Sequence, residues 1–302
     1  MEKPNIVFVM ADQLTAKALP FYGHAVVKAP TLSRLAEEGV VFENAYCNSP
    51  LCGPSRTSMM TGLLPSKTGG YDNAHDFSSA LPTFAHYMRL GGYLTCLSGK
   101  MHFTGPDQLH GYEERLTTDI YPSDFGWTPN WDEPEGKVTF QDMTNVLETG
   151  PCLRSLQIDY DDDVATKACG WLYDRARTES TQPFMLTVSF TSPHDPYVAR
   201  PEYWDLYTDD EIDLPAVPPI PANKSTNLNL LPSIDVGSNS SSSFDSMKVS
   251  PFIKVSNISP CCSVISCALS AAFKKLFRNF IKYFTRSGFI PVSSTIRCGY
   301  HQ

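Results

Sequence analysis

Short apolar runs recur along the first 190 residues of the chain, with segments of helical spacing between them. The runs cover residues 5–10, 93–98 and 184–190. Runs that are apolar at nearly every position are typical of strands buried on both faces of a parallel sheet. The hydrophobic pattern therefore predicts three strands of such a sheet.

Between these runs, apolar residues recur with the period of a helix over residues 31–39, 54–62, 81–90 and 161–177. Pro30 precedes the first segment and Gly39 ends it, which are common helix boundaries. Acidic residues begin the last segment, where they suit the positive end of the helix dipole. Strands that alternate with helices predict an α/β fold, with a mostly parallel sheet flanked by helices. Residues 106–158 are rich in Pro, Gly and Trp and predict loops.

The alternation of apolar runs and helical segments ends near residue 222, and the sign of the net charge changes at the same place. Residues 1–222 carry a net charge of −15, whereas residues 223–302 carry +7. Residues 223–260 are rich in Ser and Asn, which is typical of a disordered segment. We therefore expect a catalytic region over residues 1–222 and a separate tail over residues 223–302.

Within the tail, apolar and basic residues over 264–286 follow roughly helical spacing and predict an amphipathic helix. Two interpretations of this segment stay open. In one, the helix binds an anionic membrane or a groove on a partner. In the other, the tail arises from a frame change, an unspliced intron or a mis-joined gene and is not an evolved domain.

Composition narrows the class of protein. Of the 302 residues, 42% are hydrophobic and 19% are charged, as in a globular protein with a sizeable core. The N-terminus lacks the features of a secretory signal, and no stretch approaches the ~20 apolar residues of a transmembrane helix. We therefore expect a cytoplasmic protein whose nine cysteines stay reduced. The acidic body argues against nucleic acid as the main partner.

The most specific chemical signal lies at residues 51–62, which read Leu-Cys-Gly-Pro-Ser-Arg-Thr-Ser-Met-Met-Thr-Gly. Sulfatases carry this pattern around the Cys that a modifying enzyme oxidises to formylglycine, an aldehyde. A hydrated formylglycine offers two hydroxyls on one carbon. One hydroxyl attacks sulfur, and the other loses its proton when sulfate is expelled. The alternative is that Cys52 is a free thiol beside a proline turn that opens a helix.

Sulfate ester hydrolysis also needs cations that hold the sulfate oxygens and an acid that protonates the leaving alcohol. Arg56 lies one helical turn beyond Cys52, and its forked donors suit an oxyanion, with a surface ion pair as the alternative. Lys100 and His102 are alternate residues of a segment that we expect to be extended, so both are expected to reach one oxyanion. His194 is a candidate general acid, or else a structural histidine.

Four polar residues come directly after predicted strands: Asp12, Lys100, His102 and His194. In open α/β sheets, ligands bind outside the carboxyl ends of the strands, so we expect the chemistry to gather there. Asp12 offers a carboxylate and Gln13 an amide oxygen, which are ligands that suit a hard cation such as Ca²⁺. A helix N-cap is the alternative role for Asp12.

Residues 4 to about 221 resemble the N-terminal half of the choline sulfatases, a branch of the formylglycine-dependent sulfatases in the alkaline-phosphatase-like superfamily. The matching stretches are residues 48–56, 71–74, 97–103, 105–122, 124–129 and 192–196. The resemblance implies hydrolysis of choline-O-sulfate to choline and sulfate with a divalent metal, expected to be Ca²⁺. It also implies a formylglycine-generating enzyme as a partner and a homo-oligomeric assembly.

The resemblance gives each candidate residue a role. The implied metal ligands are Asp12, Gln13 and the modified Cys52, and the implied contacts to sulfate or the leaving group are Arg56, Lys100, His102 and His194. Asn73 would help to position sulfate. Trp127 would lie near the trimethylammonium group of choline, which aromatic faces attract, or else is a packed loop aromatic.

The resemblance stops near residue 221, whereas members of the family continue for about as long again. Because the missing half carries the remaining metal ligands, we expect a C-terminally truncated sulfatase domain. Three functions therefore compete. The chain is an active choline sulfatase, an inactive truncated pseudoenzyme or fragment that binds a partner, or a phosphonate or phosphodiester hydrolase, which shares the Cys motif.

Overall fold

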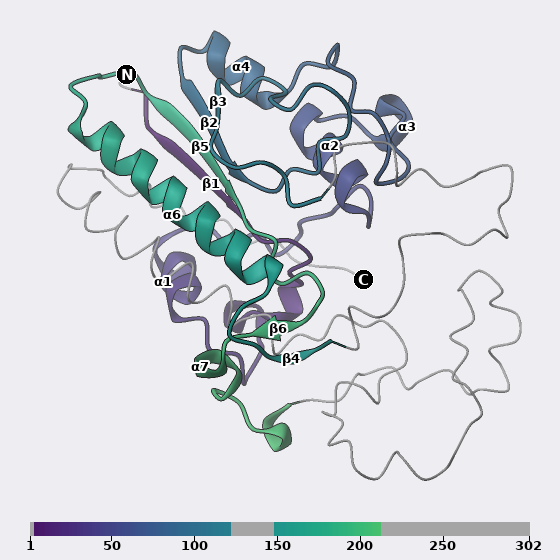
Figure 1. Ribbon diagram of the computed structural model, residues 1–302, viewed down its shortest axis with the longest axis vertical. Coiled ribbons are helices and arrows are strands. Elements are labelled where there is room, and N and C mark those ends of the chain that lie inside the picture. The colour runs from purple at the N-terminus through teal and green to yellow at the C-terminus, as the bar shows by residue number, and fades with distance from the viewer. Residues whose placement is uncertain (1–2, 122–147, 213–302) are drawn as a thin grey trace, which may run out of the picture.

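The computed structural model describes residues 3–121 and 148–212 of the chain (Figure 1). The tail over 223–302, with the predicted helix at 264–286, lies outside the described residues, as does Trp127. Among the helices that are described, none combines the length and the apolar composition that spanning a bilayer requires.

A four-stranded sheet forms the centre of the described structure, in the order β1-β5-β2-β3. Its strands are β1 (Ile6–Met10), β2 (Leu94–Gly99), β3 (Glu114–Arg115) and β5 (Phe184–Ser189). Every neighbouring pair in this sheet is parallel. The three apolar runs thus form parallel strands as predicted. The runs differ in burial, because all six residues of β5 are buried whereas all five of β1, at the edge, are half-buried.

Helices cover both faces of the sheet, which confirms the predicted fold class. The adjacent residues Cys96 and Leu97 of β2 point to opposite faces and belong to two different hydrophobic clusters. Cys96 packs with residues of α6 (Leu156–Arg177), such as Val164. Leu97 packs with Met60 of α2 (Cys52–Thr61) and with residues of α4 (Phe84–Leu90). Figure 1 shows α6 along one face and α2 and α4 on the other.

Three helices begin at other residues than the periodicity predicts, because capping residues or the Cys52 motif set their N-termini. The second helix, α2, already begins at Cys52. The helix predicted over 81–90 is α4, which begins at Phe84 because Thr83 and His86 form a capping box there. The long helix α6 begins at Leu156, five residues before the predicted start, since the Ser155 hydroxyl accepts the Ile158 amide at 3.1 Å. These shifts are the ordinary uncertainty of helix ends read from periodicity.

Smaller elements complete the described residues. They are α1 (Pro30–Glu38), α3 (Pro65–Thr68), α7 (Pro201–Trp204) and the 3-10 turns η1 (Ala16–Ala18), η2 (Pro20–Tyr22) and η3 (Asp209–Glu211). A second, two-stranded parallel sheet pairs β4 (Gly150–Pro151) with β6 (Val198–Ala199). Within the predicted loop region 106–158, the described part is mostly loop and also holds β3, β4 and the first turn of α6.

Candidate active site

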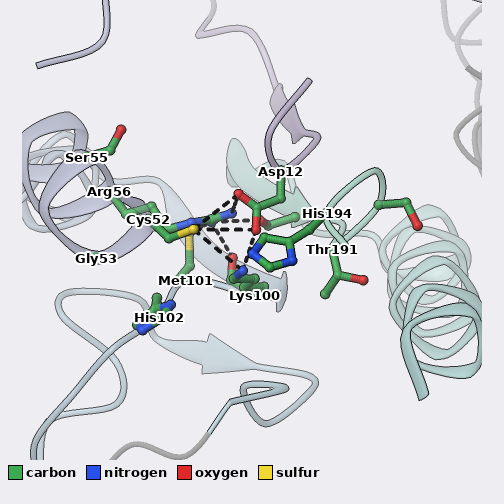
Figure 2. A network of polar contacts seen from close by, with 12 residues as sticks. Asp12, Cys52, Gly53, Ser55, Arg56, Lys100, Met101, His102, Thr191 and His194 are labelled. Atoms are coloured by element: carbon green, nitrogen blue, oxygen red, sulfur yellow. Dashed lines mark hydrogen bonds and ion pairs between the residues drawn. The ribbon is translucent and has the colours of Figure 1, made fainter. Parts of the chain in front are cut away.

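The carboxyl ends of β1, β5 and β2 lie side by side, because Met10 pairs with Ser189 and Ser189 pairs with Gly99. The segments that leave these ends carry Asp12, Lys100 and His194. The N-terminus of α2 brings Cys52 and Arg56 to the same edge. Figure 2 shows these five side chains converging at one point.

A buried ion pair joins the Lys100 ammonium to the Asp12 carboxylate. Arg56 also approaches Asp12, with Nη2 3.5 Å from Oδ1. All three residues are buried, with exposed fractions of 0% for Lys100, 4% for Arg56 and 7% for Asp12. Water therefore screens their charges weakly. Burial alone would raise the pKa of Asp12, but the charges of Lys100 and Arg56 outweigh burial and lower that pKa to about 2. Asp12 is therefore ionised at neutral pH.

The backbone around Lys100 is fixed by Arg56 and by β5. Arg56 Nη1 donates to the Lys100 carbonyl at 2.6 Å and to the Ser189 hydroxyl at 3.0 Å. The residue before Lys100 is Gly99, whose φ is +116°, and a Cβ there would collide with the Ser189 carbonyl oxygen. Glycine at position 99 thus lets β2 and β5 stay paired up to the residue where Lys100 turns toward Asp12.

Cys52 is the first residue of α2, and its thiol faces the charged cluster. The sulfur lies 3.7 Å from Asp12 Oδ1 and 3.9 Å from Lys100 Nζ. Burial raises the pKa of the Cys52 thiol, and the nearby Lys100 only partly offsets this effect. A cysteine that acts directly as a nucleophile needs a lowered pKa. The Cys52 environment therefore disfavours a reactive thiolate.

Asn73 holds the start of α2 in place. Its side-chain oxygen accepts the Gly53 amide at 2.8 Å, which satisfies one of the unpaired N–H groups at the helix end. Its backbone carbonyl accepts the His102 Nε2 proton at 3.1 Å. A direct role of Asn73 on sulfate stays a prediction, whereas its contact with the residue after Cys52 is a structural finding.

The segment from Lys100 to His102 is not a simple extended strand. His102 has a left-handed φ of 58°, and its side chain contacts Asn73, whereas the Lys100 side chain contacts Asp12. The two side chains therefore have different partners, and a common oxyanion stays a prediction. Burial, followed by the charge of Lys100, lowers the pKa of His102 to about 4, so this imidazole is neutral at pH 7.

His194 lies beside the cluster on the segment that follows β5. Its Nδ1 is 2.9 Å from the Asp195 carbonyl, which can only accept, so Nδ1 carries a proton. The Asp195 carboxylate is 3.2 Å from the same nitrogen. One ring nitrogen of His194, a carboxylate oxygen of Asp12 and the sulfur of Cys52 all lie within 4.8 Å of one another.

Gln13 has a left-handed φ of 61°, and its side-chain nitrogen donates to the Tyr197 hydroxyl at 3.1 Å. The Gln13 side chain is exposed. The donor set of Asp12 and an oxygen derived from Cys52 fits a hard divalent cation. A full shell of six to eight oxygens needs more ligands than this pair provides.

Tyr121 is a neighbour of the site that the sequence did not single out. Its ring centroid is 4.3 Å from Lys100 Nζ and 5.9 Å from the His194 ring, and its hydroxyl is 3.3 Å from His194 Nδ1. Nothing about the residue type marks Tyr121. Only its place within the matching stretch at 105–122 hinted at a role.

These residues gather a carboxylate, two buried cations, an imidazole and a thiol at the carboxyl edge of a parallel sheet. A sequence model of the sulfatase family matches residues 4–235, and the chain belongs to this family. The choline-sulfatase of Rhizobium meliloti is 50% identical over 227 residues, which cover 74% of this chain and 44% of that protein.

More distant relatives share the same region. The N-acetylglucosamine-6-O-sulfatase of Bacteroides thetaiotaomicron is 28% identical over 223 residues, covering 71% of this chain and 35% of that protein. The crystal structure of a phosphonate monoester hydrolase of Agrobacterium radiobacter superposes with a TM-score of 0.63 at 20% identity, covering 98% of this chain and 61% of the other. The latter likeness concerns the fold alone. The chain thus spans less than half the length of the curated relatives described above.

Proposed function

We propose that this chain carries the formylglycine half of a sulfuric ester hydrolase that acts on choline-O-sulfate. The observation that carries this proposal is the position of Cys52. Cys52 is the first residue of α2, and its raised pKa keeps the thiol neutral. Its sulfur lies 3.7 Å from Asp12 Oδ1 and 3.9 Å from Lys100 Nζ. The choice of choline-O-sulfate rests on the 50% identity to a choline-sulfatase.

A formylglycine-generating enzyme would oxidise Cys52 before the site becomes active, and the hydrated aldehyde would then supply the hydroxyl that attacks sulfur. A divalent cation, proposed to be Ca²⁺, would be held by Asp12, Gln13 and the modified side chain at position 52, and would withdraw charge from the sulfate oxygens. Asp12 suits this role because its low pKa keeps it ionised.

Two cations of this chain are the proposed contacts of a sulfate group beside Cys52. The ammonium of Lys100 and the guanidinium of Arg56 are buried, so each attracts an oxyanion more strongly than in water. Neutral His102 is proposed as a further contact to the sulfate or the leaving group. Because these groups are fixed before the substrate arrives, they need little reorganisation when charge builds up on the sulfate oxygens.

His194 is the proposed general acid. Its Nδ1 proton is engaged by the Asp195 carbonyl, so a proton for the leaving alcohol would come from Nε2 of the imidazolium. The Asp195 carboxylate lies 3.2 Å from Nδ1 and so contacts the same ring nitrogen. Trp127 stays the proposed partner of the choline ammonium, and Asn73 a proposed second contact of the sulfate.

A second candidate function is a fragment that binds a partner without turnover. It is favoured by one observation: the candidate metal group found among the described residues, Asp12, Cys52 and His194, offers fewer ligands than the six to eight oxygens that Ca²⁺ takes. A phosphonate or phosphodiester hydrolase is a weaker alternative, since the structural likeness to a phosphonate monoester hydrolase is at 20% identity.

The test is co-expression of the full chain with a formylglycine-generating enzyme, followed by two measurements. Mass spectrometry of the peptide with residue 52 should show the aldehyde, and the purified chain should release sulfate from choline-O-sulfate. The Cys52→Ala variant serves as control and should show neither. An aldehyde without sulfate release would favour the fragment interpretation. An unmodified thiol would overturn the proposal, and faster turnover of an aryl phosphodiester than of any sulfate ester would favour the third function.

A further inference from the structure

A buried carboxylate outside the cluster holds the segment that carries His194. Asp161, in the first half of α6, is only 6% exposed. Its Oδ1 accepts both the amide and the hydroxyl of Thr191, at 2.7 and 2.9 Å. Its Oδ2 accepts the Ser192 amide at 2.9 Å. Both oxygens of this carboxylate are therefore engaged by two consecutive residues of one turn.

That turn is connected to two members of the candidate site. The Thr191 carbonyl accepts the His194 amide at 3.0 Å, which closes the turn. The Ser192 carbonyl accepts the Asp12 amide at 3.3 Å. Asp161 thus reaches the backbone of His194 and the backbone of Asp12 through one intervening residue each, although its own side chain belongs to a helix on the face of the sheet.

The chemistry of the contacts requires a carboxylate. All three partners donate, and an ionised carboxylate accepts through both oxygens. An asparagine at position 161 would have the same shape but would turn an NH₂ group toward an N–H or an O–H donor. Burying a carboxylate is costly unless its hydrogen bonds are satisfied, and an apolar residue at position 161 would leave the Thr191 and Ser192 amides without this acceptor.

The helix that supplies Asp161 is a rigid support. α6 has 22 residues, and its Val164 and Ala168 side chains are fully buried against the sheet. The turn that it holds is short and leaves the sheet directly after β5. The position of the turn is therefore set from two sides, by β5 through the chain and by α6 through the Asp161 carboxylate.

We propose that Asp161 is a positioning residue of the hydrolase. It fixes the turn at 191–194, and through this turn it sets the placement of the His194 imidazole relative to Asp12. The effect of Asp161 on catalysis rests on the proposed function. The hydrogen bonds that connect Asp161 to the turn at 191–194 do not depend on whether the chain turns over a substrate. Groups that orient primary site residues in this way usually change activity by ~10–100-fold when they are replaced.

The test compares Asp161→Asn with Asp163→Asn in the full chain. Asp163 lies on the same helix, but it is exposed and pairs with Lys167 at 2.9 Å. If the wild-type chain releases sulfate, Asp161→Asn should lower kcat by ~10–100-fold with a smaller change in KM, and Asp163→Asn should leave both near the wild-type values. Equal effects of the two substitutions on kcat would overturn the proposal.

A readout that needs no turnover separates this proposal from the proposed function. The imidazole resonances of His194, assigned with a His194→Gln variant, should move in Asp161→Asn and stay in place in Asp163→Asn. If Asp161→Asn does not fold, Thr191→Val takes its place, because it removes one of the three hydrogen bonds and keeps the carboxylate. A folded Asp161→Asn or Thr191→Val chain with unmoved His194 resonances would show that the linkage has no positioning effect, whether or not the wild type is active.

Discussion

Lys100 and Asp12 form their ion pair across β5, which separates the two strands that they follow. Asp12 comes after β1 and Lys100 after β2, and the sheet order places β5 between them. The pair therefore closes the carboxyl edge of the sheet over the end of its most buried strand. Taking two charges out of water is costly, so a pair of this kind stabilises the fold only while both partners are present.

Removing one partner of this pair should be strongly destabilising. We expect Lys100→Met to lower the free energy of unfolding by about 3–5 kcal/mol, because the buried Asp12 then loses its ion-pair partner and keeps only the more distant Arg56, at 3.5 Å, as a salt-bridge partner. The double variant Asp12→Asn with Lys100→Met should lose much less than the sum of the two single variants. Urea unfolding of the four proteins measures this coupling, and additive losses would contradict it.

The low pKa of His102 predicts a pH-dependent stability. Below pH 6.5 the unfolded chain protonates this histidine, whereas the folded chain resists protonation until about pH 4. The free energy of unfolding should therefore fall as the pH decreases from 6.5 to 4, by up to about 3 kcal/mol from this group. The same series on His102→Gln should show a flatter profile. Parallel profiles of the two proteins would mean that His102 titrates normally.

Asn73 is expected to matter through the start of α2. In Asn73→Ala the Gly53 amide loses its partner at 2.8 Å, which should cost about 1 kcal/mol of stability, as for other helix N-terminal contacts. The exposed Asn44 provides a matched control, since Asn44→Ala should change stability little. Thermal unfolding of both variants checks the difference. A loss in Asn44→Ala as large as that in Asn73→Ala would point to a general effect of removing an amide.

Cys52→Ser separates the fold from the chemistry. A hydroxyl is close in size to the thiol, so we expect the melting temperature to change by only a few degrees, as for a substitution costing less than ~1 kcal/mol. A serine that attacked sulfur would retain the sulfate as a stable ester, because it has no second hydroxyl on the same carbon. Multiple turnovers by Cys52→Ser would argue against the gem-diol chemistry proposed above.

The parallel sheet and its carboxyl edge could be predicted from the sequence because their signals are local. The apolar runs mark β1, β2 and β5, and Asp12, Lys100 and His194 follow them directly in the chain. Parallel pairing then brings these ends together without any further information. The proline of the motif placed Cys52 at the N-terminal end of a helix predicted over 54–62, and in the structure α2 begins at Cys52 itself.

Other features of the site could not be predicted, because they depend on contacts between segments far apart in sequence. Asp119 Oδ2 accepts the amides of Met101 and His102 at 2.9 and 2.6 Å, which supports the left-handed turn at His102. An aspartate in a loop has many ordinary roles, so its residue type gives no such signal. Asp161 is similar, because helix periodicity does not show which buried position carries a functional contact.

The edge position of β1 has a consequence for self-association of the protein. Among the described strands β1 pairs with β5 alone, and its five apolar residues are half-buried. Asp12 leaves the end of this strand, and its partner Lys100 follows β2 on the other side of β5. Among the described strands, the outer side of β1 is therefore an open sheet edge, and such an edge is expected to pair with another strand or to self-associate as the protein concentration rises.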